Sequence, residues 1–288
     1  METLIIPTST AQHLAQNIKK EKKLKVIFPD KSKDKKRCFP DGEIYMKISQ
    51  VNNFKNKRVV VLHSGGPEPN QGLIELELIL QILKDNKVKP EVFFSYFPYG
   101  MQDKVFEKGE TNVAENFVEK MINYYQVKKI YIIDPHFEGR KWVKKYPIIS
   151  VSAVPYLIKK AWQDFDKNIL FLSPDKGGKR RTGFSGIKKE RITSFKIKIF
   201  SPKLNFKGKI VGVVDDIIET GGTLLKFYEF AEKSKAKKVI ALITHGVLSE
   251  GVFKIKNKYF KLYLTNTIKQ ERANIDITDL ILKTILSS

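Results

Sequence analysis

The sequence has a single cysteine, Cys38, and no long apolar run. One cysteine excludes an intrachain disulfide framework and a zinc site made of several cysteines. A transmembrane helix needs about 18 or more consecutive apolar residues, and no such stretch occurs. The N-terminal segment METLIIPTSTAQHLAQNIKK also lacks the basic start and the apolar core of a secretory signal peptide. These absences predict a protein of the reducing cytoplasm with no membrane partner.

Acidic residues are scarce relative to basic ones: 31 Asp and Glu stand against 53 Lys and Arg, which gives a net charge of +22. A charge of this size first suggests a nucleic-acid partner. The lysines, however, are spread over the whole chain, in runs such as KKEKKLK, KDKKR and EKSKAKKV. Dispersed lysine is typical of a solvated surface or of adaptation to temperature or salt. We therefore expect no nucleic acid as a partner, and an anionic small substrate as one contributor to the charge.

Chain length and composition predict two ordinary globular domains. The 288 residues exceed the usual size of a single domain, roughly 150 residues. Apolar residues make up 42% of the chain, with 17 glycines and 12 prolines, which excludes collagen-like and largely disordered chains.

Short apolar runs rich in β-branched residues alternate with stretches that suit helices. The predicted strands are Lys57–His63, Glu91–Tyr96, Lys129–Asp134, Asn168–Ser173, Lys209–Asp215, Lys238–Thr244 and Lys261–Thr265. The predicted helices are Gln71–Lys84, Asn112–Tyr125, Val154–Trp162, Thr223–Ser234 and Asp276–Leu286. Near-continuous apolar strands between helices are typical of a parallel sheet that is covered on both faces. The predicted fold class is therefore α/β.

The pattern is doubled along the chain. KRVVVLHSGG and NILFLSPDKGG are each a strand followed by a polar turn with paired glycines, and KIYIIDPH and IVGVVDDIIETGG each contain a strand that ends in acid. We therefore expect two similar doubly wound parallel-sheet domains, residues 1–148 and 149–288, joined near Pro147–Pro155. The last helix could pack back on the first domain. Asp175–Ser201 is rich in Gly, Lys and Arg, which predicts a long irregular segment that is either functional or disordered.

The most specific local motif is VGVVDDIIETGGT. An apolar strand runs into Asp215 and Asp216, and Thr220-Gly221-Gly222-Thr223 then opens a helix. Glycines allow successive backbone N–H groups to turn inward, and the helix N-terminus adds a positive dipole, so the turn suits a phosphate. The two carboxylates can accept hydrogen bonds from sugar hydroxyls or hold a metal through water. As a bare pattern, the turn could also be a plain strand-to-helix connection.

This motif resembles the phosphoribosyl-diphosphate-binding signature of the type I phosphoribosyltransferase fold, and in the form VVDDIIETGGT it is most similar to the ribose-phosphate pyrophosphokinases. Four further segments resemble motifs of that family in the same order. RCFPDGEIYMKI (37–48) and YFPYGMQDKVFEKGE (96–110) are similar to its two nucleotide motifs, the second with the KxFxxGE tail of the archaeal branch. IIDPHFEG (132–139) and LSPDKGG (172–178) are similar to its metal-binding strand end and its loop for a second metal and ribose phosphate.

The resemblance implies a reaction and a set of site residues. The family moves the diphosphoryl group of ATP to the 1-hydroxyl of ribose 5-phosphate, giving 5-phosphoribosyl 1-diphosphate and AMP, with Mg²⁺ as cofactor. Carried over by motif, the ribose 5-phosphate residues are Asp215, Asp216, Glu219, Thr220, Gly221, Gly222 and Thr223. The ATP residues are Phe39, Asp41, Gly42, Glu43, Met101, Gln102 and Lys104, and the metal residues are His136 and Asp175. Phe39 is expected to complete the adenine site of a neighbouring subunit, which implies a homo-oligomer, a dimer or larger.

Two segments bear on catalysis and on nucleotide binding. Both substrates are anionic, so neutralisation of charge should dominate catalysis. In IKKERIT, Lys189 and Arg191 match the Lys-x-Arg pair of a mobile catalytic loop, with Lys188 as the neighbour that would shift the assignment by one. Met101 stands where the family usually has Arg, and the loss of a guanidinium removes charge-assisted hydrogen bonds to the nucleotide. Imidazole is an uncommon magnesium ligand, so His136 could contact phosphate oxygens instead.

Two other functions stay open on the residues alone. A phosphoribosyltransferase that consumes phosphoribosyl diphosphate would share the TGGT turn but has no need of the FPDGE and PYGMQDK segments. A non-catalytic regulatory or RNA-binding relative of the same fold would suit the high positive charge, and Met101 favours it. Such a relative would be free to lose Lys189, Arg191 and His136, which this chain keeps. Formation of AMP from ATP and ribose 5-phosphate distinguishes the enzyme from both alternatives.

Overall fold

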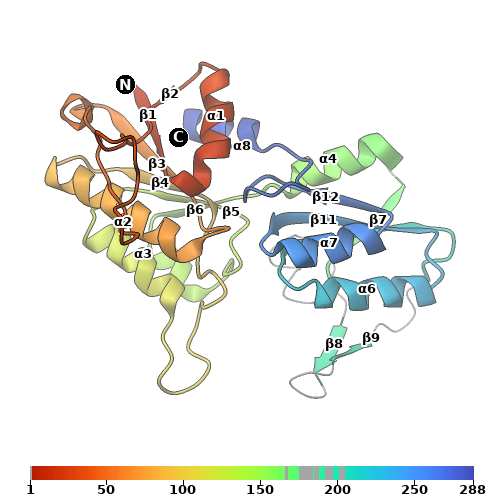
Figure 1. Ribbon diagram of the computed structural model, residues 1–288. Coiled ribbons are helices and arrows are strands. Elements are labelled where there is room, and N and C mark those ends of the chain that lie inside the picture. Colours follow the sequence, from red (N-terminus) through yellow and green to blue (C-terminus); the bar gives the residue numbers. More distant parts are fainter. Residues whose placement is uncertain (1, 166–167, 175–183, 185–187, 192–196, 201–204) are drawn as a thin grey trace. The chain divides into compact units, whose positions relative to one another are not determined.

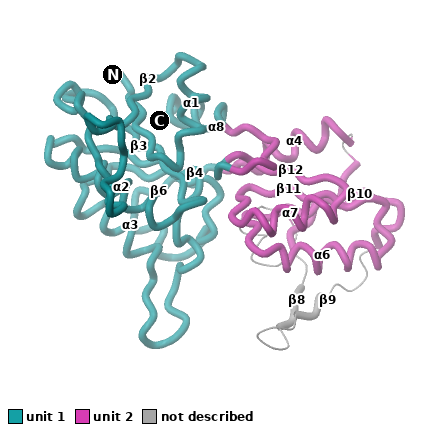
Figure 2. The backbone as a smooth tube through the Cα atoms, in the orientation of Figure 1, with its two compact units in different colours: residues 1–151, 267–269, 278–288 teal, residues 152–266, 270–277 magenta. Residues whose placement is uncertain are grey.

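The computed structural model describes residues 2–165, 168–174, 184, 188–191, 197–200 and 205–288. They form two compact α/β units (Figure 2). Unit 1 comprises Met1–Val151, Thr267–Lys269 and Thr278–Ser288, and unit 2 comprises Ser152–Asn266 and Gln270–Ile277. In the described chain, no helix is both long enough and apolar enough to cross a membrane.

Unit 1 is built on a parallel sheet in the order β2-β1-β3-β4-β5-β6. Its strands are β1 (Thr3–Pro7), β2 (Lys25–Val26), β3 (Arg58–Ser64), β4 (Glu91–Tyr96), β5 (Ile130–Ile133) and β6 (Ile148–Val151). Its helices are α1 (Gln12–Lys20), α2 (Pro69–Asp85), α3 (Val113–Asn123) and α8 (Thr278–Leu286), with 3-10 turns at Ser9–Ala11, Val51–Phe54 and Lys141–Lys145 (Figure 1). The first and longest segment of the unit ends with β6, an edge strand that pairs with β5.

Helices cover both faces of this sheet, which is why its strands are apolar along their length. α2 and α3 supply Leu80 and Phe117 to a core that also holds alternate strand residues such as Phe94. The buried residues of α1 and α8 lie outside that core, and these two helices contact each other. Arg58, at the start of β3, holds α8 in place by donating from Nη1 to the carbonyl of Ile285. The last helix of the chain thus belongs to unit 1.

Unit 2 is built on a second parallel sheet, in the order β12-β11-β10-β7 over the residues that are described. The strands are β7 (Ile169–Leu172), β10 (Ile210–Ile218), β11 (Lys238–Gly246) and β12 (Lys261–Leu264), and the helices are α4 (Val154–Phe165), α6 (Gly222–Lys233) and α7 (Ser249–Lys258). α6 and α7 pack on one face with Val213, and α4 packs on the other with Val214. A separate antiparallel ribbon consists of β8 (Lys188–Arg191) and β9 (Ile197–Phe200).

The predicted α/β class, with parallel sheets between helices, is confirmed. Each predicted strand and helix has an observed counterpart. The strands β1, β2, β6, β8 and β9 and the helices α1 and α7 were not predicted. β10 runs past the predicted end at Asp215, because β11 pairs with it as far as Ile218 and Gly246. The prediction of an irregular segment over Asp175–Ser201 is wrong for residues 188–191 and 197–200, because β8 and β9 pair there.

Candidate active site

The acidic pair of unit 2 lies within β10, near its carboxyl end. Asp215 and Asp216 are nearly buried, with exposed fractions of 7% and 3%. Alternation along the strand places Val213 and Asp215 on the face of α6 and α7, and Val214 and Asp216 on the face of α4. The backbone N–H of Asp216 donates to Asp215 Oδ1 at 3.1 Å. The two carboxylates therefore approach the carboxyl edge of the sheet from opposite faces.

The predicted phosphate turn connects β10 to α6. Gly221 precedes the helix and has a φ of +80°, a left-handed conformation that L side chains adopt only with strain. Glu219, Thr220 and Gly222 are exposed and Thr223 is half-buried, so the surface of the turn is accessible. The structure describes the whole first turn of α6, and this turn contains no acidic residue. The N–H groups at the start of α6 can therefore bind an anion.

For the predicted catalytic pair, Lys189 and Arg191, the structure describes only the backbone. Lys189 and Arg191 lie on β8, where they pair with Ile199 and Ile197 of β9. Asp175, the predicted metal residue of this unit, lies outside the described residues. The positions of these three groups relative to the acidic pair stay a prediction.

In unit 1, the loop after β4 that carries the predicted nucleotide residues Met101, Gln102 and Lys104 has a buried anchor. Asp103 is 3% exposed, and its carboxylate accepts two hydrogen bonds from Arg140, Nε to Oδ2 at 2.6 Å and Nη2 to Oδ1 at 3.0 Å. The Trp142 indole N–H donates to the Asp103 carbonyl at 3.2 Å. A bidentate charged pair of this kind fixes both position and orientation. No local pattern in the sequence points to Asp103 or Arg140 as a pair, because the two residues lie far apart in the chain.

The neighbours of Asp103 on this loop are presented to solvent. Met101 is 41% exposed, and Gln102 and Lys104 are also exposed. The carbonyl of Gln102 accepts from the Ala114 N–H at 3.1 Å, which ties the loop to the start of α3. Lys104 Nζ lies 4.1 Å from the centre of the Phe106 ring, a cation–π contact. The loop thus has a rigid base and an accessible polar surface.

His136 follows β5 on a tight turn at the carboxyl edge of the unit 1 sheet. Asp134 has a φ of +36°, and its N–H donates to the carbonyl of Val151 at 3.0 Å. His136 itself is half-buried. Over the described ranges, no three His, Cys, Asp or Glu side chains gather into a group that could hold a metal ion.

The predicted adenine segment, residues 39–43, is an exposed tight turn. The Glu43 N–H donates to Asp41 Oδ1 at 3.0 Å, and Gly42 has a φ of +94°. Both acids are exposed, and Phe39 is 50% exposed. An aromatic ring half in solvent beside two carboxylates is available to a ligand or to another protein surface.

The two predicted nucleotide segments of unit 1 lie near opposite ends of α2. Phe39 lines a hollow of about 330 Å³ together with Leu78 and Ile82, in the second half of the helix. Tyr99, at the base of the other loop, donates from its hydroxyl to Asn70 Oδ1 at the start of the helix. With a rise of 1.5 Å per residue, these contact points are about 12–18 Å apart along the helix axis.

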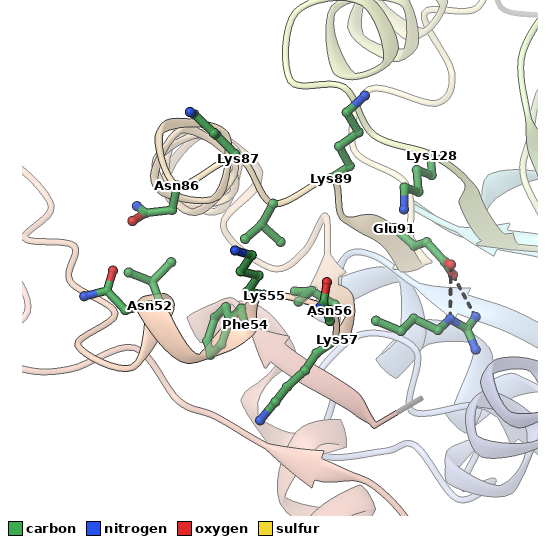
Figure 3. Close-up of a pocket in the computed structure, with 14 residues that line it drawn as sticks. Asn52, Phe54, Lys55, Asn56, Lys57, Asn86, Lys87, Lys89, Glu91 and Lys128 are labelled. Carbon is green, nitrogen blue, oxygen red and sulfur yellow. Dashed lines mark hydrogen bonds and ion pairs between the residues drawn. The ribbon is translucent and has the colours of Figure 1, made fainter.

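A larger hollow of unit 1, about 570 Å³, lies at the amino-terminal edge of the sheet (Figure 3). Its basic lining residues are Lys55, Lys57, Arg58, Lys87, Lys89 and Lys128. Arg58 and Glu91 form an ion pair there at 2.7 Å, which raises the pKa of the Arg58 guanidinium mainly through their hydrogen bond. The sequence-predicted site residues do not line this hollow.

The predicted resemblance is confirmed by similar proteins. Residues 3–125 match the family model described as the N-terminal domain of ribose phosphate pyrophosphokinase, and residues 174–275 match the phosphoribosyl transferase domain. The ribose-phosphate pyrophosphokinase of Pyrococcus abyssi is 30% identical over 98% of this chain and 98% of its own, and that of Sulfolobus acidocaldarius is 31% identical over 84% and 87%. The crystal structure of phosphoribosylpyrophosphate synthetase from Mycobacterium smegmatis has the same fold, with a TM-score of 0.84 over 100% of this chain and 98% of that chain at 22% identity. The chain therefore belongs to the ribose-phosphate pyrophosphokinase family.

Proposed function

We propose that this chain transfers the diphosphoryl group of ATP to the 1-hydroxyl of ribose 5-phosphate, with unit 1 binding ATP and unit 2 binding ribose 5-phosphate. The observation that carries the proposal is the end of β10, where two nearly buried acids precede a left-handed glycine at the N-terminus of α6. Hydrogen-bond acceptors for sugar hydroxyls next to N–H groups for a phosphate are what a sugar phosphate requires. The single cysteine supports a cytoplasmic location for this activity.

In unit 2, the ribose hydroxyls donate to Asp215 and Asp216, and the 5-phosphate binds the turn that opens α6. The proposed contacts are Glu219, Thr220, Gly221, Gly222 and Thr223. Two observations support this assignment. The turn is exposed, and the described first turn of α6 contains no acidic residue. Loss of one acid should weaken ribose 5-phosphate binding much more than ATP binding.

In unit 1, ATP binds the loop that carries Met101, Gln102 and Lys104, and Phe39 of a second copy covers the adenine. The 12–18 Å that separate the two segments along α2 support a site completed by another subunit, and so does the half-exposed ring. A two-fold dimer would complete both sites reciprocally. We therefore propose a homo-oligomer of at least two chains.

The proposed metal is Mg²⁺, which usually keeps several waters and takes one or two protein ligands together with substrate phosphates. The described residues fit that mode, since they hold no cage of three ligating side chains. His136 and Asp175 are the residues proposed to hold the ion or its waters. When bound, the ion neutralises phosphate oxygens of the two anionic substrates.

Catalysis is assigned to charge neutralisation by Lys189 and Arg191, both on β8. In this proposal they donate to the oxygens of the transferring group, whose negative charge spreads in the transition state. The loop held by Asp103 keeps the nucleotide contacts of unit 1 in place while β10 and α6 hold the acceptor sugar.

The test is an assay of AMP formation from ATP, ribose 5-phosphate and Mg²⁺ with the full chain. We expect AMP and phosphoribosyl diphosphate in equal amounts, and Asp215→Asn should raise the KM for ribose 5-phosphate far more than the KM for ATP. A chain that forms no AMP but consumes phosphoribosyl diphosphate with a nucleobase would be a phosphoribosyltransferase instead. A variant affected in ATP saturation alone would contradict the assignment of β10.

A further inference from the structure

α7 lies directly behind the proposed phosphate turn, although no motif relates the two. Gly251, in the first turn of α7, has its α carbon directly against the peptide between Glu219 and Thr220. A Cβ built on Gly251 would lie 1.7 Å from the Glu219 carbonyl oxygen and 2.8 Å from its carbon. The chain that leads into α7 is also tied to β10, since the Val247 N–H donates to the Ile218 carbonyl at 2.9 Å. Backbone therefore touches backbone at the start of the turn.

Ile255 in α7 and Tyr259, which directly follows the helix, also contact the phosphate turn and the start of α6. A Cβ on Gly221 would lie 3.3 Å from Ile255, and the Tyr259 hydroxyl donates to the Leu224 carbonyl at 2.6 Å. Gly251, Ile255 and Tyr259 are spaced by four residues, so they lie on one face of the helix. This face meets the turn in chain order, from Glu219 through to the first turn of α6.

The hydrogen bond from the Tyr259 hydroxyl to the Leu224 carbonyl persists because the phenol keeps its proton. Tyr259 is 4% exposed, and burial, together with the nearby Asp215 carboxylate, raises the pKa of its phenol well above the ordinary value. The phenol therefore keeps its proton and remains a donor to the Leu224 carbonyl. It also lies close enough to Asp215 to sense the acid that is proposed to bind ribose.

We propose that this face of α7 sets the conformation of the phosphate turn, residues 219–224, and that Gly251 is a positioning residue for ribose 5-phosphate. This inference rests on the proposed function, since it assigns the turn to that substrate. A phosphate is bound by several N–H groups at once, so a shift of about 1 Å in the turn misaligns all of them. The position of α7 is therefore part of the affinity for the sugar phosphate.

Gly251→Ala provides a direct perturbation. Alanine is the better helix former, so at an unhindered helical position this change would stabilise the protein. Here the methyl group would overlap the Glu219 carbonyl, so either the turn or α7 must move. We expect ribose 5-phosphate to bind about ten- to hundredfold more weakly, with the KM for ATP changed by less than about twofold. Tyr259→Phe, which removes one hydroxyl, should weaken ribose 5-phosphate binding by a few-fold.

The matched control is Gly212→Ala. Gly212 lies near the start of β10, where a Cβ would meet the Phe171 ring at 2.7 Å and thus also disturb packing in unit 2. It does so away from the turn, so we expect lower thermal stability with ribose 5-phosphate affinity close to that of the parent. Equal losses of affinity in both variants would mean that any damage to unit 2 weakens binding, and would overturn the inference.

Calorimetric titration of each full-length variant with ribose 5-phosphate gives the affinity for that substrate. Steady-state kinetics with both substrates give the two KM values. Weaker ribose 5-phosphate binding by Gly251→Ala and Tyr259→Phe, with an unchanged KM for ATP, supports the inference. If Tyr259→Phe and a folded Gly251→Ala both bind ribose 5-phosphate as tightly as the parent, the inference is overturned. In that case AMP formation by the parent still supports the proposed function. If Gly251→Ala does not fold, Tyr259→Phe decides alone. A parent that neither binds ribose 5-phosphate nor forms AMP removes the proposed function, and this inference with it.

Discussion

Removal of the Arg140 side chain should loosen the loop that carries the proposed nucleotide residues. In Arg140→Ala the Asp103 carboxylate, 4% exposed as a side chain, loses both of its charged donors. Breaking a buried pair by removing one partner costs about 3–5 kcal/mol. Because the Arg140 side chain is 32% exposed, water can replace part of the lost interaction, and we expect a loss of about 2–3 kcal/mol in the free energy of unfolding.

A double-mutant cycle separates the pair from the general loss of packing. Asp103→Ala in the Arg140→Ala background removes the uncompensated carboxylate, so the double variant should be less destabilised than the sum of the single ones. We expect a coupling free energy of about 1–2 kcal/mol. Arg140→Lys should recover only part of the loss, because a lysine ammonium cannot make the bidentate contact.

Trp142 provides a local reporter for this cycle. Its indole N–H donates to the Asp103 carbonyl, and its side chain is buried, whereas Trp162 is 41% exposed. Urea unfolding followed by Trp142 fluorescence in a Trp162→Phe background would report on unit 1. The KM for ATP, measured in parallel, should rise with the loss of stability. Strictly additive losses would refute the coupling, and an unchanged KM for ATP would refute the anchoring role.

Three other predictions concern catalysis, nucleotide binding and pH. Lys189→Ala should lower kcat by orders of magnitude in steady-state assays with KM almost unchanged; a larger loss in Lys188→Ala would shift the assigned register by one. Met101→Arg should tighten ATP binding by about tenfold, since a charged hydrogen bond contributes about 1.5–3 kcal/mol; calorimetry that shows no change at low or moderate salt would mean that residue 101 points away from ATP. Burial lowers the pKa of His63 to about 3, so below pH ~6.5 the unfolded chain binds a proton that the folded chain excludes. Urea unfolding should therefore show stability falling by about 1 kcal/mol per pH unit between pH ~6 and ~4, and an equal slope in His63→Gln would contradict this cause.

Local patterns predicted the elements whose apolar residues are continuous. β3, β4, β5, β10 and β11 are buried on both faces, and they stand out as apolar runs of Val, Ile, Leu and aromatic residues. α7 has no such signal: its sequence SEGVFKIKNK contains a glycine near the start, and only Gly251, Val252 and Ile255 are buried. Packing against the turn and β11 holds it in place. The extra length of β10 likewise depends on its pairing with β11, which is a long-range contact.

The α/β class, the order of the motifs and the turn before α6 could all be predicted from sequence, because they depend on residues that are neighbours in the chain. Asp215, Asp216 and Gly221 are six or fewer positions apart, so their joint role follows from one short motif. Three other features emerge only from the folded chain: Arg140 holds Asp103, Gly251 supports the phosphate turn, and Phe39 lies at the far end of α2 from Tyr99. The physical reason is that these contacts join residues about thirty or more positions apart, and such pairs meet only when several helices and strands have packed together.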